Sequence, residues 1–575
     1  MHKLSCQFRT LSLITGALLA SCNVQSVTAD TIIYNAKVYT VNLEKPWVQA
    51  IAIKDSKIVS LGSDTDILQL KGPDTQIMDA GGNFVMPGFI EGHGHFPGLG
   101  SSLRILNLLH SRSWEEIVEA VAVKVKTAKP GEWIIGRGWH QEKWLQTPGQ
   151  NVLGYPYHHA LSAVSPSNPV LLEHASGHAL LANRAAMDAA GVTLETTDPK
   201  GGHIVRGDGD EAIGVFEENA QDIIEEAHRQ YLTSLSEEEI HADWYEGIRL
   251  AQDECLRKGI TSFQDAGSSL EEVTRLEDLA LAGELDIRLW MMIRHTSDYL
   301  LDKLSEFPKV GLGQDFFTCR ALKISIDGAL GTYGAWLLEP YTDNPGFIGQ
   351  NTSSLDELAK LADLCAEHQL QLCTHAIGDR ANREVLNVYE QKMVQHKLSQ
   401  DVRWRIEHAQ HLSPEDIPRF GRLHVIASMQ GIHCTSDAPF VIKRLGEKRA
   451  KSGAYVWRSL LDSGAVVANG TDTPVEDIDP IKSLYATVTR KRVDSAMEFY
   501  PEQKLTRAEA IYSYTMANAY AAFEENIKGS LEPDKYADII VLSKDIMSCT
   551  DEEIPDAKVL LTIVNGEIKY RQSGF

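Results

Sequence analysis

The residues with the clearest potential for chemistry are His93 and His95, which follow the apolar run that begins at Val85. Residues two apart on a strand point to the same face, so this pair can offer two imidazole nitrogens to one metal ion. The pair alone is weak evidence, because 20 histidines in 575 residues give roughly 0.7 such pairs by chance. A metal site therefore needs further ligands from elsewhere in the chain.

Four more possible metal ligands lie at or near the ends of other apolar runs. They are Lys323, His375, His408 and Asp472. Each run is bounded by a turn signal or by a helix-like segment, which indicates strands alternating with helices around a parallel sheet. When such a sheet closes into a barrel, the C-terminal ends of its strands meet at one mouth, and these side chains would converge there.

The strands that must position these residues can be identified in order. We predict eight, namely Phe84–Gly92, Thr261–Asp265, Ile287–Ile293, Arg320–Ile326, Leu370–His375, Trp404–His408, Val425–Gln430 and Val466–Thr471. Ser354–His368 and Arg380–Val394 have the pattern of amphipathic helices between strands. The fold class is therefore α/β, a (β/α)8 TIM barrel. About 165 residues separate the first two strands, which predicts an inserted subdomain over the mouth.

The orientation of Lys323 follows from the alternation along its strand. Leu322 and Ile324 share one face, which should pack on the outer helices, and Lys323 lies on the other. Lys323 then points into the barrel, where an unpaired ammonium group is costly. The side chain is either a metal ligand or the partner of Asp327 or Asp472 in an ion pair.

Both ends of the mature chain have the pattern of short strands. Thr31–Val41 and Gln49–Leu61 form one set, and Ala537–Leu542 and Val559–Tyr570 form the other, with Asn565-Gly566 as a hairpin signal. Two sets so far apart in sequence suggest one small β-sandwich built from both termini.

The composition is that of a large globular enzyme. Hydrophobic residues make up 43% and charged residues 23% of the chain, enough to bury a substantial core. The net charge of −24 is spread along the chain, with no basic stripe to neutralise phosphates, so nucleic acid is excluded as a partner. The same charge disfavours electrostatic docking on anionic lipid.

The N-terminus has the pattern of a targeting segment, residues 1–29, which is left out of the fold. Lys3 and Arg9 give a basic start, and Leu11–Ala20 is an apolar stretch too short to span a bilayer. Leu19-Ala-Ser-Cys22 is similar to a bacterial lipobox with Cys22 as the lipidated residue; the alternative is simple cleavage after Ala29. Either way the expected location is extracytoplasmic: a membrane-anchored lipoprotein, or a soluble periplasmic or secreted protein.

Several longer motifs together resemble the amidohydrolase superfamily. They are Pro87-Gly-Phe-Ile-Glu-Gly-His-Gly-His95, Thr374-His-Ala-Ile-Gly-Asp379, Arg405-Ile-Glu-His-Ala-Gln410 and Gly470-Thr-Asp-Thr-Pro474. Further motifs resemble its YtcJ-like (amidohydrolase 3) branch, which includes N-substituted formamide deformylases; these are Lys323–Gly328 with Glu339-Pro-Tyr341, Gly138–Trp144 and Gly529–Asp538. The resemblance runs from about Thr31 to the C-terminus.

The resemblance implies a domain plan. Residues 30–84 and 527–575 would form the composite β-sandwich, and residues 85–526 the metal-dependent barrel with an inserted subdomain over 97–245. It also implies that Lys323 is carboxylated and bridges two metal ions, and that Asp472 is catalytic. Asp472 could instead be a helix N-cap, since the residues after it have the pattern of a helix start.

The metal set follows from these assignments. His93, His95 and Lys323 would hold one ion, Lys323, His375 and His408 the other, with Asp472 as a further ligand. Two zinc ions suit imidazole and carboxylate ligands, with manganese or iron as alternatives. A metal-activated hydroxide would attack the amide carbonyl while Asp472 acts as general base and then acid. The expected reaction is hydrolysis of carbon–nitrogen bonds other than peptide bonds, in linear amides of the N-acyl or N-formyl amine type.

Other functions remain open at this point. The same site could serve an esterase or lactonase, a cyclic amidase, or an isomerase or deaminase of similar fold. The chain could also be an inactive, lipid-anchored binding protein on this scaffold. If Lys323 carries no bridge, a mononuclear site of His93, His95, His375 and Asp472 is the better interpretation. The substrate would be a small molecule, and a homodimer is neither required nor excluded.

Substrate contacts are assigned to four residues on less evidence. Trp139, His174 and His178 fall in the predicted insert, and His433 follows the seventh strand and should face the mouth. Gly207-Asp-Gly-Asp-Glu211 has the carboxylates of a calcium loop but not the length or ligand spacing of an EF-hand, so we interpret it as a turn.

Overall fold

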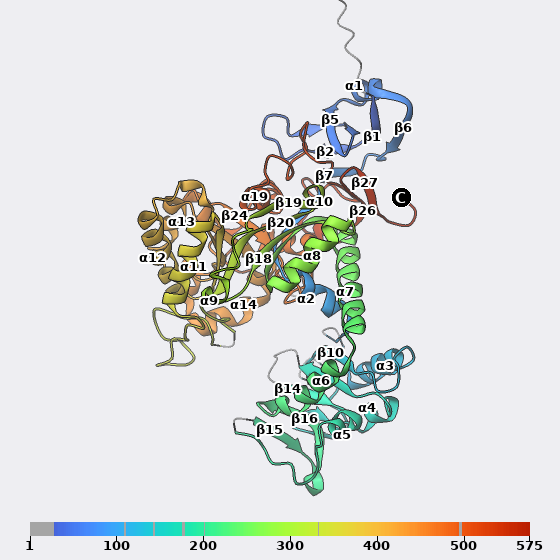
Figure 1. The fold of residues 1–575 in the computed structure, drawn as a ribbon, viewed down its shortest axis with the longest axis vertical. Coiled ribbons are helices and arrows are strands. Elements are labelled where there is room, and N and C mark those ends of the chain that lie inside the picture. Colours follow the sequence, from blue (N-terminus) through green and yellow to red (C-terminus); the bar gives the residue numbers. More distant parts are fainter. Residues whose placement is uncertain are drawn as a thin grey trace, which may run out of the picture.

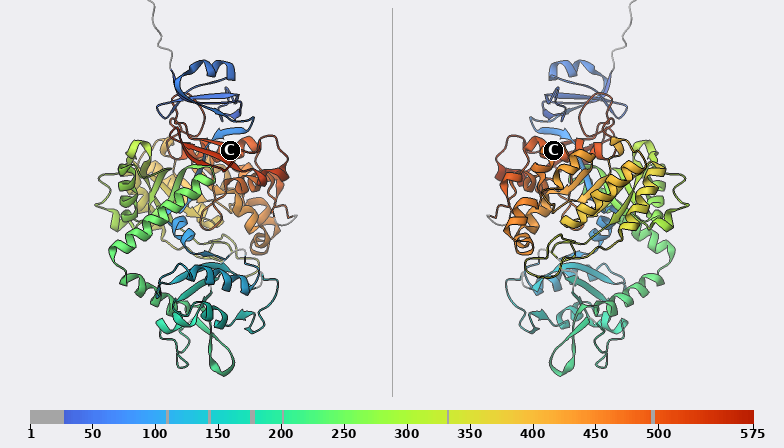
Figure 2. Two further views of the ribbon diagram at one scale, coloured as in Figure 1. Left: turned by 90° about the vertical axis from the view of Figure 1, so that its right-hand side faces the viewer. Right: turned by 90° about the vertical axis from the view of Figure 1, so that its left-hand side faces the viewer.

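The computed structural model describes residues 28–575 apart from 109–110, 142–143, 175–178, 201, 332 and 494–496. Cys22 and the substrate candidate His178 lie outside the described residues. A β-sandwich, a central barrel and an inserted subdomain follow one another along the long axis (Figures 1 and 2). Within the described part, no helix is both long and apolar enough to cross a membrane.

The central part is a parallel barrel, so the predicted fold class is confirmed. Its strand order is β24-β23-β22-β21-β20-β18-β17-β8, and β19 (Lys309–Gly311) pairs with β20. The barrel strands are β8 (Phe89–Gly94), β17 (Ile260–Ser268), β18 (Arg288–Ile293), β20 (Phe317–Ser325), β21 (Gln371–Ala376), β22 (Arg405–His408), β23 (Ile426–Gln430) and β24 (Val467–Gly470). At the C-terminal ends of the first and last strands, Asp472 N donates to His93 O (2.8 Å) and His95 N to Thr473 O (2.7 Å). These two bonds join the ends of the sheet at the mouth.

The predicted first strand is in fact two. Phe84–Pro87 forms β7 of the sandwich, and the chain enters the barrel as β8 only after Gly88. A Cβ at Gly88 would lie 2.2 Å from the Thr261 side chain, so only glycine fits where the chain passes between the two sheets.

Helices cover the outside of the barrel and begin at clear sequence signals. Capping boxes, Ser236 with Glu239 and Ser269 with Glu272, start α7 (Glu237–Arg257) and α8 (Leu270–Ala282). The two helices predicted between strands are confirmed as α11 (Leu355–His368) and α12 (Asp379–Gln395). Other helices of this layer are α13 (Ile417–Leu423), α14 (Gly431–Leu445), α16 (Trp457–Asp462), α17 (Pro480–Thr489) and α18 (Arg507–Ser513). The carbonyl groups of α19 (Met516–Ala521) instead accept from Gln264 of β17 and Gln371 of β21.

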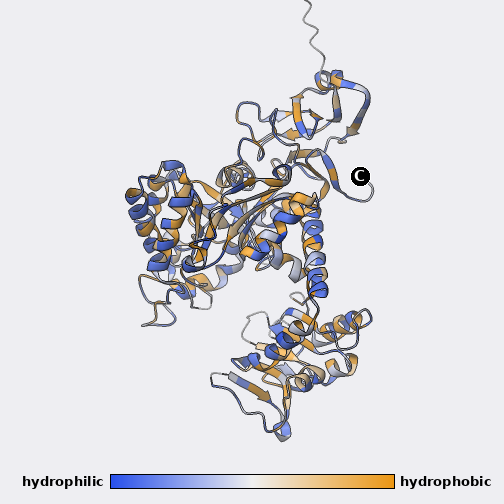
Figure 3. Cartoon of the chain, viewed as in Figure 1, coloured by the Kyte–Doolittle hydropathy of each residue, from blue (hydrophilic) through white to orange (hydrophobic). Residues whose placement is uncertain are grey.

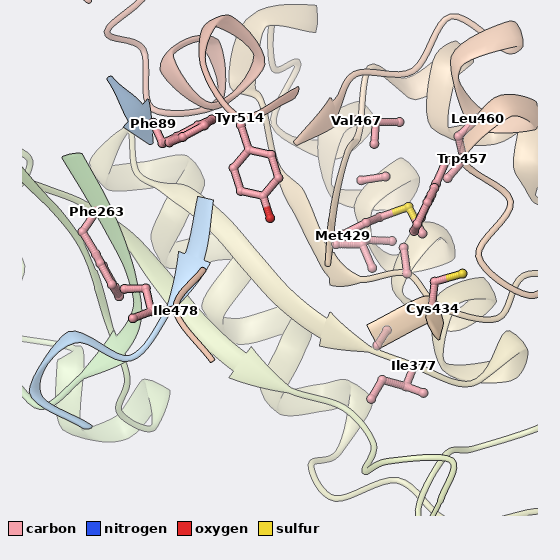
Figure 4. Close-up of a cluster of buried hydrophobic side chains, with 14 of the residues drawn as sticks. Phe89, Phe263, Ile377, Met429, Cys434, Trp457, Leu460, Val467, Ile478 and Tyr514 are labelled. Atoms are coloured by element: carbon pink, nitrogen blue, oxygen red, sulfur yellow. The ribbon is translucent and has the colours of Figure 1, made fainter. Parts of the chain in front are cut away.

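The hydrophobic core lies mainly between the strands and these helices. Figure 4 shows Met429 of β23 and Val467 of β24 gathered with Trp457 and Leu460 of α16. A smaller buried cluster consists of Ala266, Trp290, Met292, Ala321 and Cys373 of the barrel strands, together with Ala522, which follows α19. The barrel interior is thus packed with side chains, as expected for this fold.

The sandwich combines both ends of the chain, as predicted. One sheet has the order β5-β4-β1-β6 and the other β27-β26-β25-β7-β2-β3. Their bounds are β1 (Ala29–Tyr34), β2 (Lys37–Tyr39), β3 (Trp47–Val48), β4 (Ala50–Lys54), β5 (Lys57–Gly62), β6 (Lys71–Asp79), β25 (Ile539–Leu542), β26 (Val559–Val564) and β27 (Glu567–Arg571). The hairpin signal is also confirmed, because Asn565 and Gly566 both have positive φ (56° and 78°) between β26 and β27.

The inserted subdomain is a second α/β unit with the sheet order β15-β16-β14-β13-β10-β9. Its elements are β9 (Leu106–Asn107), α3 (Trp114–Val125), β10 (Ile134–Trp139), α4 (His159–Val164), β13 (Val170–His174), β14 (Ala179–Ala182), α5 (Arg184–Ala189), β15 (Gly202–Arg206), β16 (Ala212–Glu218) and α6 (Gln221–Ser234). Leu171 and Leu172 contribute to separate cores, so both faces of the sheet are covered.

Two helices connect the insert to the barrel, α2 (Phe96–Arg104) and α7. They pack closely, since a Cβ on Gly100 would lie 2.4 Å from the Gly247 carbonyl oxygen. The part of α7 that runs between the insert and the barrel is mostly hydrophilic (Figure 3). The insert lies on the side of the barrel that holds α2 and α14, the helices that directly follow β8 and β23 (Figure 1). It therefore faces the mouth.

Candidate metal centre

The mouth of the barrel brings the His-x-His pair together with Asp472. His93 belongs to β8 and is fully buried, and His95 follows that strand directly. Asp472 Oδ1 lies 3.6 Å from His93 Nε2 and 3.3 Å from His95 Nε2. One ligand atom from each residue falls within 4.8 Å of the others, which is close enough for one metal ion to be shared.

The environment of His93 determines which of its nitrogens carries the lone pair. Glu407 lies against Nδ1 and is held by Arg405, whose Nε donates to it at 2.7 Å. Burial raises the pKa of Glu407, but Arg405 and then His93 outweigh it and hold the pKa well below its usual value. Ionised Glu407 must accept the Nδ1 proton, so the Nε2 of a neutral His93 has a lone pair that faces the carboxylate of Asp472.

Two acceptors that face each other in a buried site repel unless a cation lies between them. His93 Nε2 and Asp472 Oδ1 are both buried and have no hydrogen-bond partner among the described residues. A carboxylate that fixes the outer nitrogen of a histidine is also the usual arrangement behind a metal ligand. The residues present therefore fit a divalent metal ion.

His375 of β21 and His408 of β22 extend this group. Their ring centroids lie 4.5 Å apart, and the His408 ring is 4.7 Å from that of His93. His408 Nδ1 is 2.8 Å from Gln430 Oε1, an acceptor, which leaves the His408 Nε2 lone pair free to bind a metal. His375 Nε2 is buried and has no hydrogen-bond partner within the described part of the chain.

Burial keeps these imidazoles neutral. It lowers the pKa of His93 to about 4 and that of His375 to about 3, with the charge of Lys323 acting in the same direction. It also lowers the pKa of His408 well below its usual value, with help from the neighbouring histidines. Neutral imidazole is the form that binds a metal, so all three rings are ready to act as ligands at neutral pH.

His433 differs from these histidines in its tautomer. Its Nδ1 accepts from the amide Nε2 of Gln410 at 3.0 Å, so the proton of a neutral ring is on the His433 Nε2. That nitrogen lies 3.9 Å from Asp472 Oδ2 and has no hydrogen-bond partner among the described residues. His433 thus presents a buried N–H donor to the site, as suits the substrate contact predicted for it.

Asp472 occupies a strained backbone position. Its φ of 60° is in the left-handed region, and His408 has a φ of 73°, so both residues carry strain of the kind that collects at functional sites. The next helix, α17, starts only at Pro480 and is capped by Asp479, which rules out the N-cap alternative for Asp472. Burial raises the pKa of Asp472, but the interactions with His95 and His93 outweigh it and hold the pKa well below its usual range.

Lys323 points into the barrel, as predicted. It is 97% buried, and its Nζ donates to the Ala266 carbonyl oxygen at 3.2 Å. Among the described residues it has no ion pair within 4 Å, and the carboxylate of Asp327 instead accepts the backbone N–H groups of Trp336, Ile377 and Gly378. Burial lowers the pKa of Lys323. Neither Asp327 nor Asp472 thus forms an ion pair with Lys323 within 4 Å in the structure, although the charge of Asp472 still acts to raise the pKa of the lysine.

Four buried carboxylates support the site, and only one of them, Asp327, is assigned a role from the sequence, as a possible ion-pair partner of Lys323. Glu91 accepts from Thr471 N (2.6 Å) and so ties β8 to β24. Asp265 accepts from Phe96 N (2.8 Å), the residue after His95. Asp327 holds the backbone of Trp336, Ile377 and Gly378, and Glu407 holds the ring of His93. The signal that could have revealed Glu407 is the pair Arg405 and Glu407, two opposite charges two positions apart in an apolar strand.

Two of the substrate residues predicted in the insert, Trp139 and His174, are buried within the insert itself. Trp139 is 99% buried in the core of the insert, and its indole N–H donates to Leu172 O at 2.8 Å, so it packs the insert and has no surface to offer a substrate. His174 is also buried, with Nε2 3.0 Å from Gln141 Oε1 and its ring against Trp139. His178 lies outside the described residues.

Residues 76–570, most of the chain, match the amidohydrolase family. The chain belongs to this family. It is therefore a hydrolase that acts on carbon–nitrogen bonds, and the resemblance inferred from the motifs is confirmed.

The chain aligns with individual relatives over almost its full length. The chain is 30% identical to the putative amidohydrolase YtcJ of Bacillus subtilis, over 93% of this chain and 98% of that protein. It is 26% identical to the N-substituted formamide deformylase of Arthrobacter pascens, over 95% and 99%. A crystal structure of an uncharacterized metal-dependent hydrolase from Pyrococcus horikoshii matches with a TM-score of 0.71 and 26% identity, over 91% and 99% of the two chains.

Proposed function

We propose that this protein is a metal-dependent hydrolase of linear amides, of the N-acyl or N-formyl amine type. The observation that carries the proposal is the set of buried nitrogen and oxygen atoms that meet at the barrel mouth without hydrogen-bond partners: His93 Nε2, His375 Nε2, His433 Nε2 and Asp472 Oδ1, all within the described residues. The similarity to a formamide deformylase supports an N-acyl or N-formyl substrate.

The residues that would hold the metal are the three neutral histidines of β8, β21 and β22, together with His95, Asp472 and Lys323. We propose two zinc ions, and we propose that Lys323 is carboxylated. Burial favours the neutral amine of Lys323, whose lone pair can add to CO2 with loss of a proton to give a carbamate anion. Bound zinc would supply Lewis acidity, which polarises the amide carbonyl and lowers the pKa of water.

Asp472 would carry out the proton transfers, and His433 would contact the carbonyl oxygen. The ionised carboxylate of Asp472 accepts one proton of the attacking water and passes it to the nitrogen of the leaving amine, as general base and then acid. The Nε2–H of His433 donates to the substrate oxygen, where negative charge develops as the carbonyl carbon becomes tetrahedral. Collapse of that species breaks the carbon–nitrogen bond and yields a carboxylic acid and an amine.

Removal of the metal should abolish hydrolysis. Chelation, followed by dialysis until elemental analysis shows no metal, should leave only the uncatalysed rate on an N-formyl amine, and added zinc or manganese should restore turnover. The physical reason is that the lone pairs of the metal ligands cannot polarise a carbonyl or lower the pKa of water, and the single N–H group of His433 does not replace a cation. Full activity of a sample that is verified to be metal-free would refute the proposal.

The same assay separates the amide from the other candidate bonds. A panel that pairs each N-formyl or N-acyl amine with the ester and the lactone or cyclic amide of the same acyl group tests the proposed bond directly. A kcat/KM for the linear amides above that for the esters and cyclic compounds supports the proposal. A preference for the ester or lactone would make this chain an esterase or lactonase on the same site.

We further propose that the mature protein is extracytoplasmic and anchored through Cys22. Cys22→Ser should release the protein from the membrane fraction or block its processing, because serine cannot accept the thioether-linked lipid. Ser21→Ala, one position before it, is the matched control and should leave the protein in the membrane fraction. A wild-type protein recovered as soluble material that starts at Asp30 would show that cleavage after Ala29 is correct.

A further inference from the structure

A second group of metal-binding side chains lies in the inserted subdomain, separate from the barrel mouth. His158 and His159 lie at the start of α4. Glu211 is the last residue of the loop between β15 and β16, directly before β16. Glu211 Oε1 is 3.5 Å from His159 Nε2 and 3.9 Å from His158 Nε2. One ligand atom of each residue lies within 4.8 Å of the others.

These distances are too long for hydrogen bonds and close to those around a zinc ion. Zinc binds imidazole nitrogen and carboxylate oxygen at about 2.0–2.2 Å, so two ligands in tetrahedral geometry lie roughly 3.3–3.5 Å apart. The 3.5 Å pair already has this spacing, and the 3.9 Å pair exceeds it by about 0.4 Å.

His158 supplies an independent sign of a ligand. The residue is 4% exposed, and its Nε2 is buried without a hydrogen-bond partner among the described residues. Its Nδ1 lies 2.8 Å from Ser162 Oγ, and that hydroxyl accepts from Arg184 N. A histidine whose outer nitrogen is fixed by a polar partner and whose inner nitrogen is unpartnered has the arrangement of a metal ligand. Burial lowers the pKa of His158 to about 4, which leaves the ring neutral.

The backbone holds the three residues together without help from an ion. His158 N donates to Ile213 O at 2.8 Å, which joins the start of α4 to β16. Gly207 N donates to Glu211 O at 2.8 Å and closes the loop that the sequence indicates as a turn. A Cβ at Gly207 would lie 2.1 Å from Tyr157 Oη, so this loop packs closely against the segment before α4. The turn thus places Glu211 beside both histidines.

We propose that His158, His159 and Glu211 bind one zinc ion, which fastens the β15–β16 loop to the start of α4. The two nitrogens and one carboxylate oxygen are ligands that zinc prefers, and a water molecule would complete the four-coordinate set, since His159 and Glu211 are open to solvent. This site would stabilise the insert that faces the barrel mouth and would take no part in hydrolysis.

Counting bound zinc tests the proposal. Full-length protein is stripped with a chelator, dialysed to equilibrium against zinc chloride and analysed for zinc per chain. The double variant His159→Gln/Glu211→Gln should bind one equivalent less than wild type and retain its hydrolytic activity. The matched control is His203→Gln, which breaks an exposed His–Glu pair (3.0 Å to Glu217) between β15 and β16 and should keep the wild-type count. Equal counts in wild type and the double variant would overturn the proposal.

Amide hydrogen exchange in residues 206–213 of the wild-type protein gives a second measurement, and its main result does not require the variant to fold. At zinc 100-fold above its Kd, opening of the loop that releases the ion should be about 100-fold rarer, and exchange in wild type should slow by that factor. The double variant should show no such change, which separates this site from an indirect effect of metal in the barrel. Exchange that is independent of zinc in wild type would overturn the proposal.

Discussion

Replacement of Asp472 by Asn is expected to lower kcat by about 10²–10⁴-fold, the usual contribution of a positioned general acid–base group. The amide of Asn retains one oxygen in nearly the same place and can still contact a metal, but it cannot accept a proton from water and return it to the amine. The site favours this role, because Asp472 lies within 4 Å of His93, His95 and His433 and its carboxylate is held ionised.

Asp477→Asn is the matched control for this experiment. Asp477 lies five residues further along the same loop, is half-exposed and pairs with Lys482 at 2.7 Å, so the same chemical change there should leave kcat unaltered. Both variants are assayed at saturating zinc with bound metal measured in parallel. If Asp472→Asn retains its metal and its kcat stays within about threefold of wild type, another group carries the proton.

The candidate ligands could be predicted because the fold fixes where strands end. An apolar run followed by a turn marks the C-terminal end of a buried strand, and all such ends in a parallel barrel meet at the mouth. His375 and His408 needed no further information, whereas for Asp472 the resemblance favoured catalysis and the structure excluded the helix N-cap. The orientation of Lys323 followed from the alternation of side chains, which the structure bears out by placing Leu322 and Ile324 in the outer core and Ala321 in the inner cluster.

The supporting carboxylates could not be predicted in the same way. Glu407 acquires its role from His93, which is 314 residues away in the sequence. Asp327 binds backbone groups of a loop that begins about 50 residues later, at Ile377. The charge pair Arg405 and Glu407 could have indicated a buried carboxylate, but the sequence next to these residues does not reveal partners that lie so far away in the chain.

The break at Gly88 shows a different limit. The residues on both sides of it are apolar and buried, since β7 lies in the core of the sandwich and β8 in the wall of the barrel. Burial on both faces removes the alternation that would distinguish two strands from one. Trp139 is a similar case, because a buried tryptophan in a core and one that lines a substrate pocket have the same sequence pattern.

Lys323→Ala is expected to lose metal and activity together. If the carbamate of Lys323 binds the metal directly, its loss should reduce metal affinity by more than the 10–100-fold that is typical when a group behind a ligand is removed. Lys323→Met is the matched variant, since it keeps the length and packing of the side chain but has no amine to react with CO2. Both variants should bind less zinc than wild type while they remain folded by circular dichroism.

Rescue distinguishes a ligand from a packing residue. Short carboxylic acids such as formate or acetate should partly restore zinc and turnover to Lys323→Ala, because a free carboxylate can occupy the space that the side chain leaves. The same acids should have no effect on Lys323→Met, whose side chain fills that space. Reconstitution of metal-free wild type should also be slower in CO2-free buffer than in bicarbonate. An unmodified lysine in a crystal structure with the metals bound would contradict the carbamate, and a mononuclear site of His93, His95, His375 and Asp472 would then replace the two-metal proposal.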